Sequence, residues 1–244
     1  MRKLVSLVVV LGLLALAGTT IVGCEKSTEA KPPPPKTTII LIDRTDGILK
    51  EQQSQFLYEL KILKDDLVEK DRLIIYDVPG DTKKYLKEYN PLYSSIVPQN
   101  PDTCNSITTT CKFVKENYEK YESKFSEAIN NIVLDKTYDK SYILEAIRMI
   151  SRTKEIESLK NKKFVIFSNM LQNSAALTHY RKYSKIKELP KDLYILDINN
   201  ALFKTNVFVY MLRTNDRLQN KKLEQWWSDY FNIAKANSVT IQKF

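Results

Sequence analysis

The sequence is poor in the residues on which many catalytic sites depend. Its 244 residues include five glycines, three cysteines and one histidine. So few glycines leave no Gly-rich phosphate-binding loop, and no Gly-x-Ser-x-Gly motif marks a hydrolase nucleophile. The single histidine, His179, has no second histidine or cysteine pair beside it with which to form a zinc site, and we expect it on an ordinary helical surface. We therefore expect a protein that is not an enzyme.

The N-terminal segment carries the clearest signal that is present. Arg2 and Lys3 precede an apolar run over residues 4–17, and the segment closes with Ile-Val-Gly-Cys at 21–24. This pattern resembles a bacterial lipoprotein signal peptide, which implies cleavage after residue 23 and a covalent lipid, such as palmitate, on Cys24. The alternative is an uncleaved transmembrane anchor, because residues 4–22 are just long enough to span a bilayer.

Either arrangement places the remaining chain outside the cytoplasm. With a lipid on Cys24, the protein is anchored to the cell membrane or the outer membrane, and its folded part faces the periplasm or the exterior. Glu25 is not the aspartate that is associated with inner-membrane retention in enteric bacteria, so the outer membrane is slightly favoured. Residues 24–36 contain Pro32 to Pro35 and are expected to form a stiff tether of about 3 Å per proline.

The chain carries a net charge of +9, of which Arg2 and Lys3 contribute two charges, so the mature part keeps +7. A solvated surface is one interpretation, and contact with anionic lipid, cell-wall polymer or an acidic protein is the other. No basic stripe interleaved with aromatics indicates nucleic acid, so no nucleic-acid partner is expected. The charges are scattered over many lysines: Lys61, Lys64, Lys83, Lys84, Lys160, Lys162, Lys163, Lys221 and Lys222.

Cys104 and Cys111 are separated by six residues and would lie in an oxidising compartment. This spacing predicts a disulfide that closes a small loop and stabilises the fold by roughly 2–3 kcal/mol. The surrounding segment, residues 79–112, has no periodicity and is rich in Pro, Asn, Ser and Thr. We expect it to be a long exposed insertion that the disulfide closes.

Residues 37–244 alternate short β-branched apolar runs with amphipathic stretches, which predicts one α/β domain. The expected fold is a doubly wound, mainly parallel sheet with helices on both faces. Trp226 and Trp227 are expected in its core. Buried strands are predicted at 37–42, 73–78, 164–167, 206–212 and 239–241, and helices at 49–70, 114–132, 143–150, 175–188 and 223–234.

The first predicted strand ends in the sequence Asp-Arg-Thr-Asp-Gly at 43–47. In a parallel sheet, ligands bind at the carboxyl ends of the strands. Asp43 and Thr45 are two residues apart, so their side chains share one side of an extended chain. Carboxylate and hydroxyl oxygens are ligands for a hard divalent cation, although Asp46-Gly47 could simply be the turn into the next helix.

These residues resemble the metal-ion-dependent adhesion site of the von Willebrand factor A domain, and the likeness covers residues 37–242. That family places Asp-x-Ser/Thr-x-Ser after its first strand, a second hydroxyl before a later helix and an aspartate after its fourth strand. The resemblance implies a site for Mg²⁺ or Mn²⁺ made of Asp43, Thr45, Ser141 and Asn169. Two positions depart from the pattern, because Gly47 replaces a serine and Asn169 replaces the aspartate.

The resemblance implies an envelope lipoprotein that binds a protein partner, with a divalent cation in the site. Two alternatives stay open. Asp43, Asp46 and Ser168 superficially resemble a phosphohydrolase of the haloacid-dehalogenase type, but that mechanism needs its two aspartates two residues apart, and here they are three apart. The other alternative is a structural envelope protein in which the site is vestigial.

Overall fold

The fold is known from a computed structural model of the chain. The description that follows covers residues 33–78, 80, 89–107, 110–134 (without the side chains of 133 and 134), 138–181, 184–189, 200–214 and 217–244. Cys24, the predicted signal peptide and most of the predicted tether lie outside these residues. Residues 34–244 form one compact unit.

Strand β1 (Thr37–Ile42) is the hydrophobic centre of the sheet, and all six of its residues are buried. It pairs in parallel along its whole length with β2 (Arg72–Asp77) on one side and β4 (Lys162–Ser168) on the other. Such a strand needs apolar side chains on both faces, which explains the unbroken Ile-Ile-Leu-Ile run.

The six strands of the described chain follow the order β3-β2-β1-β4-β5-β6. Strands β5 (Thr205–Met211) and β6 (Ser238–Lys243) continue the parallel arrangement, and only β3 (Tyr93–Ile96) runs antiparallel, at the edge beside β2. The predicted doubly wound α/β fold is confirmed.

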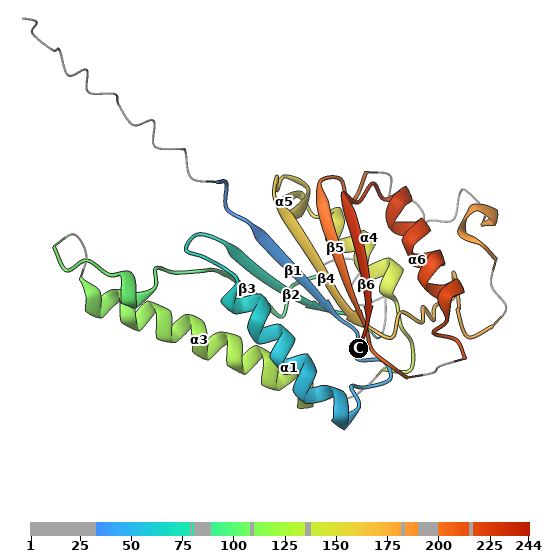
Figure 1. Ribbon diagram of the computed structural model, residues 1–244, viewed down its shortest axis with the longest axis horizontal. Coiled ribbons are helices and arrows are strands. Elements are labelled where there is room, and N and C mark those ends of the chain that lie inside the picture. The colour runs from blue at the N-terminus through green and yellow to red at the C-terminus, as the bar shows by residue number, and fades with distance from the viewer. Residues whose placement is uncertain are drawn as a thin grey trace, which may run out of the picture. The chain divides into compact units, whose positions relative to one another are not determined.

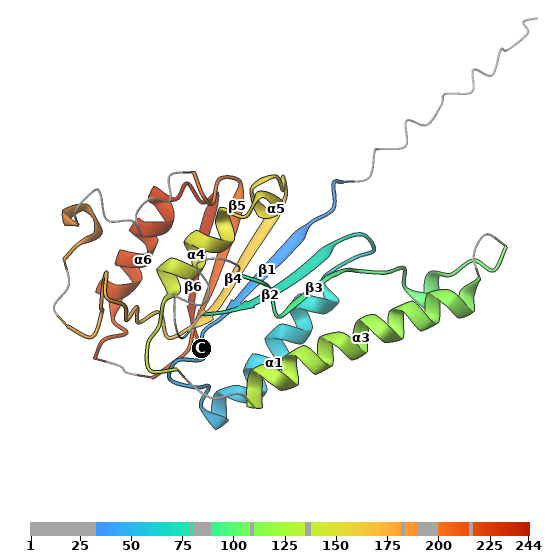
Figure 2. The same ribbon diagram turned by 180° about the vertical axis from the view of Figure 1, so that it is seen from behind.

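Helices cover both faces of the sheet (Figures 1 and 2). Ile39 and Leu41 of β1 pack in one core cluster with α4 (Ile143–Ser151), α5 (Lys154–Glu157) and α6 (Lys221–Ile233). Ile40 and Ile42 pack in the other with α1 (Lys50–Asp65) and α3 (Cys111–Leu134). This division follows from the alternation of side chains along a strand. The two tryptophans lie in the first cluster and are buried, as predicted.

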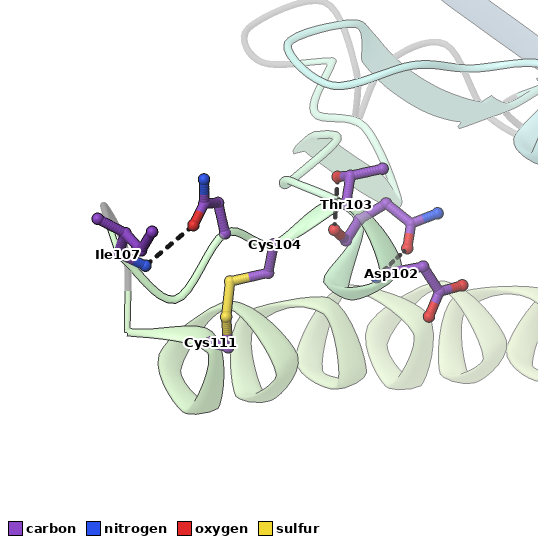
Figure 3. The surroundings of a disulfide bond; sticks show 7 residues. Asp102, Thr103, Cys104, Ile107 and Cys111 are labelled. Atoms are coloured by element: carbon purple, nitrogen blue, oxygen red, sulfur yellow. Dashed lines mark hydrogen bonds between the residues drawn. A yellow bond between two sulfur atoms is a disulfide. The ribbon is translucent and has the colours of Figure 1, made fainter.

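The segment at 79–112 is not wholly an exposed insertion, as the sequence pattern suggested. It contains β3 and a short 3₁₀ helix, η1 (Pro101–Thr103), and Tyr93 and Val97 are buried against α1 and α3. The predicted disulfide is present: Cys104 and Cys111 have Cα atoms 5.7 Å apart and join the loop after η1 to the first turn of α3 (Figure 3).

The predicted helix at 175–188 is also wrong over the residues that the structure describes there. An isolated β-bridge joins Asn173 and Thr178, and only the 3₁₀ turn η2 (Ile186–Glu188) is helical. His179 is buried rather than on a surface, with its ring edge-on to the indoles of Trp226 and Trp227. The bridge turns the chain back on itself, which carries the imidazole into the core.

No helix among the described residues is both long enough and apolar enough to cross a membrane. Both core clusters draw their side chains from residues 39–234, so the apolar interior lies entirely within the 34–244 unit. A protein that comprises residues 25–244 therefore keeps every core contact of the described structure.

Candidate functional site

The candidate site lies where the chain connections diverge. The chain leaves β1 toward β2 on one side of the sheet and leaves β4 toward β5 on the other, so the carboxyl ends of β1 and β4 flank a topological switch point. Ligands of open α/β sheets bind at such points. Asp43 extends the pairing at this end, because its backbone N–H donates to the carbonyl of Phe167 at 2.8 Å.

The Asp43 carboxylate gathers three hydroxyl groups, from the loop after β1, the segment before α4 and the last residue of β4. Its Oδ2 accepts from the Oγ of Ser141 at 2.8 Å and from the Oγ of Ser168 at 2.7 Å. Its Oδ1 accepts from the backbone N–H of Thr45 at 3.0 Å and from the Oγ1 of Thr45. Residues that are far apart in the sequence thus meet on one carboxylate.

This carboxylate is almost completely shielded from water, with Asp43 only 4% exposed. Burial raises the pKa of Asp43, since desolvation disfavours the charged form, while the hydrogen bonds from Thr45, Ser168 and Ser141 act in the opposite direction. The group is therefore a buried acid that is satisfied by neutral donors.

Asn169 faces a different carboxylate from the one predicted. Its Nδ2 donates to Oδ2 of Asp46, and its Oδ1 accepts from the backbone N–H of Leu171 at 2.7 Å. The hydroxyl of Tyr180 donates to the same Asp46 oxygen at 3.0 Å. Asp46 and Tyr180 are exposed, so they form an outer layer of the site, and burial together with the charge of Asp46 raises the pKa of Tyr180.

Gly47 occupies the position where the adhesion-site pattern has a serine, and its backbone explains the difference. Its φ is 71°, in the left-handed region, and its N–H donates to the carbonyl of Arg44 at 3.2 Å. A side chain is disfavoured in that conformation, whereas glycine adopts it at little cost. The tight turn therefore excludes the third hydroxyl of the pattern.

A buried ion pair lies beside the Asp43 network. Arg44 donates through Nη2 to Oδ2 of Asp77 at the end of β2, and the two side chains are 6% and 7% exposed. The same Nη2 donates to the hydroxyl of Tyr138 at 3.2 Å. Arg44 thus fixes the loop after β1 to the neighbouring strand.

A second buried network sets the position of Ser141. The carbonyl of Ser141 accepts from the backbone N–H of Asn173 at 2.8 Å. The side chain of Gln172 accepts from the N–H of Leu144 at 3.0 Å and donates to Oε2 of Glu145 at 2.8 Å. These bonds tie the start of α4 to the loop after β4, so the hydroxyl of Ser141 is held in place.

The side chains around Asp43 supply oxygen atoms of the kind that coordinate a hard cation. Asp43, Thr45, Ser141 and Ser168 offer carboxylate and hydroxyl oxygens, which Mg²⁺ and Mn²⁺ prefer. A cation on Asp43 would require these three hydroxyls to turn their protons away, because each now donates to the carboxylate, as does the backbone N–H of Thr45. Within the described ranges, no group of three or more His, Cys, Asp or Glu side chains gathers to hold a metal.

No family model matches this sequence, and no curated protein matches it. The site therefore has to be interpreted from its own geometry.

Three of the four predicted ligand residues, Asp43, Thr45 and Ser141, are brought together by the structure. The fourth, Asn169, lies in the outer layer on Asp46, and its neighbour Ser168 takes the place on Asp43. Adjacent residues of an extended chain point to opposite sides, so Ser168 and Asn169 cannot both face Asp43. Continuing the alternation of β4 past Phe167 could have indicated that Ser168 is the residue that does.

Proposed function

We propose that this protein is a lipid-anchored lipoprotein of the cell envelope whose α/β domain binds a protein partner at the carboxyl edge of its sheet. The observation that carries the proposal is the convergence of Thr45, Ser141 and Ser168 on the buried Asp43 at the switch point. A set of loops that is fixed this firmly presents a constant surface to a partner.

Binding is favoured over catalysis by the state of the acidic groups. Both oxygens of Asp43 are occupied by protein donors, and the residue is buried, so it is not presented as a nucleophile. Asp46 is exposed but is held by Asn169 and Tyr180. The outer layer offers a partner the ring of Tyr180, a residue type that is enriched at protein interfaces, beside the charge of Asp46.

Mg²⁺ or Mn²⁺ is proposed as the cofactor of this site. When bound, the cation would supply a positive point that an acidic group of the partner can coordinate. Asp43 would hold the cation, with Thr45, Ser141 and Ser168 as the neutral oxygens. Asn169 would act through the position of Asp46.

The metal proposal can be tested by calorimetric titration of Mg²⁺ and Mn²⁺ into a protein comprising residues 25–244. The matched variants are Asp43→Asn, which keeps the shape of the side chain, and Asp102→Asn, which removes an exposed carboxylate of η1. We expect saturable binding in the parent and in Asp102→Asn, and none in Asp43→Asn. Absence of heat in all three would mean that the site is vestigial.

The two alternatives are tested with the same proteins. Turnover of a generic phosphate ester that disappears in Asp43→Asn would replace the binding proposal with a phosphohydrolase of the haloacid-dehalogenase type. A partner that is captured from the envelope equally well by parent and Asp43→Asn would instead favour a structural protein whose partner contacts lie elsewhere.

The anchor is tested separately by metabolic labelling of the full chain with radioactive palmitate. The parent should incorporate label, and Cys24→Ala should not, whereas detergent partitioning does not distinguish them because the variant keeps the apolar segment at 4–22. Label in Cys24→Ala, or its absence from the parent, would contradict the lipid anchor without affecting the binding proposal.

A further inference from the structure

The amino edge of the sheet, opposite the candidate site, holds a basic pocket. The first residue of β1, Thr37, pairs with Lys162 at the start of β4, and Lys162 pairs with Thr205 at the start of β5. Beside these strand starts, the end of α4, the short α5 and the loop before β5 enclose a depression of about 710 Å³. In Figure 1, α5 and the starts of β4 and β5 lie at the same edge of the sheet as the start of β1.

Positive charge dominates the lining of this basic pocket. Four cationic side chains line it, Arg152, Lys160, Lys162 and Lys204, against one carboxylate, that of Glu157. The hydroxyls of Ser151 and Ser158 and the amide of Asn200 add neutral hydrogen-bonding groups. This composition suits an anion with several acceptor oxygens, such as a phosphate group.

The lysines of the basic pocket form no close ion pair within the described part of the chain. Lys160, Lys162 and Lys204 take part in no ion pair there. Lys162 is only 6% exposed and its Nζ donates to the carbonyl of Ile156 at 3.4 Å, and burial lowers its pKa. The charge of Glu157 offsets part of the cost of burying this ammonium but forms no ion pair with it, so an anion in the pocket would relieve more of that cost.

An exposed aromatic ring lies beside these cations. Phe203 lines the basic pocket and is 55% exposed, with the Nζ of Lys204 5.2 Å from the ring centre. Phenyl rings flanked by lysines are typical of surfaces that enter the boundary between lipid headgroups and acyl chains. The pocket thus offers both a polar and an apolar contact.

The chain enters the domain at this same edge. The backbone N–H of Thr37 donates to the carbonyl of Asn161 at 2.9 Å, one residue from both Lys160 and Lys162. Thirteen residue steps separate Thr37 from Cys24, which is a reach of at most about 45 Å. A lipid on Cys24 would therefore limit the distance between this edge and the membrane surface to about 45 Å and leave the basic pocket free to reach it.

We propose that this pocket binds the phosphate headgroup of an anionic phospholipid in the membrane to which the protein is anchored. The proposal rests on the proposed lipid anchor for its orientation, but headgroup binding itself is a property of the folded domain. The field of anionic headgroups fades within a Debye length of about 8 Å, so a docked edge gains attraction that a tethered one does not. Docking turns the carboxyl edge, with Asp43 and Asp46, away from the membrane and toward a partner.

The test is sedimentation of the protein comprising residues 25–244, which carries no lipid, with vesicles of two compositions. One set contains phosphatidylcholine alone, and the other contains phosphatidylcholine and phosphatidylglycerol in a two-to-one mixture. The variant Lys160→Glu/Lys204→Glu changes two pocket residues. The control Lys61→Glu/Lys120→Glu makes the same change of net charge at two exposed positions of α1 and α3.

We expect the parent to bind the phosphatidylglycerol vesicles and not the neutral ones. The pocket variant should bind at least about tenfold more weakly, because each cation near an anionic surface contributes roughly a fivefold factor that reversal turns into repulsion. The control should lose much less, and both proteins should keep the parent's circular dichroism spectrum.

Three outcomes would overturn the proposal: no binding to phosphatidylglycerol vesicles by the parent, equal losses in both variants, or displacement by millimolar glycerol phosphate. Equal losses would show that binding follows net charge rather than the pocket. Displacement by glycerol phosphate would show that the pocket takes a free phosphate ester. None of these results depends on Cys24, so they are distinct from failure of the palmitate experiment.

Discussion

The Asp43 network and the exposed lysines of the basic pocket lie at opposite edges of the sheet and differ in how their polar groups are held. At the carboxyl edge, Asp43 and the Arg44–Asp77 pair are buried, and each has protein partners at hydrogen-bonding distance. At the amino edge, Lys160 and Lys204 are exposed and form no ion pair with any described residue. The same strands run between the two edges, so the difference in the burial and partners of these polar side chains comes from the loops at each edge.

This contrast separates polar groups that stabilise the fold from those that are available to bind a ligand or a partner. Breaking a buried, satisfied network leaves groups without partners and lowers stability. Exposed charges contribute little to folding, so their removal should affect binding only. The following predictions test that division, beginning with the largest expected effect.

Replacing Arg44 with methionine should lower the free energy of unfolding by about 3–5 kcal/mol, because it leaves Asp77 buried without its counter-charge. Urea denaturation followed by the fluorescence of Trp226 and Trp227 measures this loss. The double variant Arg44→Met/Asp77→Leu should recover most of it, because neither charge remains. A single variant within about 1 kcal/mol of the parent would show that the pair is not structural.

His179 should make the protein sensitive to acid. Burial lowers its pKa from 6.5 to about 4, so the unfolded chain binds a proton in this interval that the folded protein does not. The contribution of His179 to the free energy of unfolding is fully present above pH 6.5. It falls by about 3 kcal/mol as the pH drops toward 4. The comparison is the change in urea midpoint between pH 7 and pH 4 for the parent and for His179→Phe. An identical change in both would contradict a buried neutral imidazole.

The disulfide should contribute a smaller, local stabilisation at the start of α3. Replacing Cys104 and Cys111 with serine should cost about 2–3 kcal/mol, because the loop they close is short. Hydrogen exchange should show faster exchange in the first turns of α3 and no change around Asp43. Faster exchange at the carboxyl edge as well would mean that the two regions unfold together.

The lysines of the basic pocket should matter least for folding. Lys160→Glu/Lys204→Glu should change the free energy of unfolding by no more than about 0.5 kcal/mol, because both side chains are exposed. The same variant should still bind phosphatidylglycerol vesicles at least about tenfold more weakly than the parent. Destabilisation of more than 2 kcal/mol would place these lysines among the structural groups and end the contrast between the edges.

The main elements of the fold follow from the sequence because their signals are strong. The apolar runs of β1 and β4 and the apolar stripe of α3 have lengths and periods that few alternatives share. Strand β3 escaped prediction because it is four residues long, lies at an edge and contains two adjacent serines and only one buried residue, Tyr93. The helix expected at 175–188 failed because its apolar residues pack around a β-bridge, which local periodicity does not report.

The site is predictable in part for the same reason. Asp43 and Thr45 share a side of the chain by simple alternation, so their contact follows from spacing alone. Ser168 and Asn169 are both polar and adjacent, and only the register of β4 against β1 decides that Ser168 meets Asp43. The basic pocket depends on the end of α4, α5 and the loop before β5, which meet only in space, and no local pattern in the sequence marks it.

The central position of β1 has a mechanical consequence. Its six residues pair with β2 on one side and β4 on the other, and the chain from the predicted anchor joins it at Thr37. A partner that pulls on the carboxyl edge of an anchored protein would load β1 along its own axis. Two ladders of backbone hydrogen bonds would then resist together in shear, instead of opening one bond at a time. Under the proposed anchor and partner, β1 would carry the tension between the two.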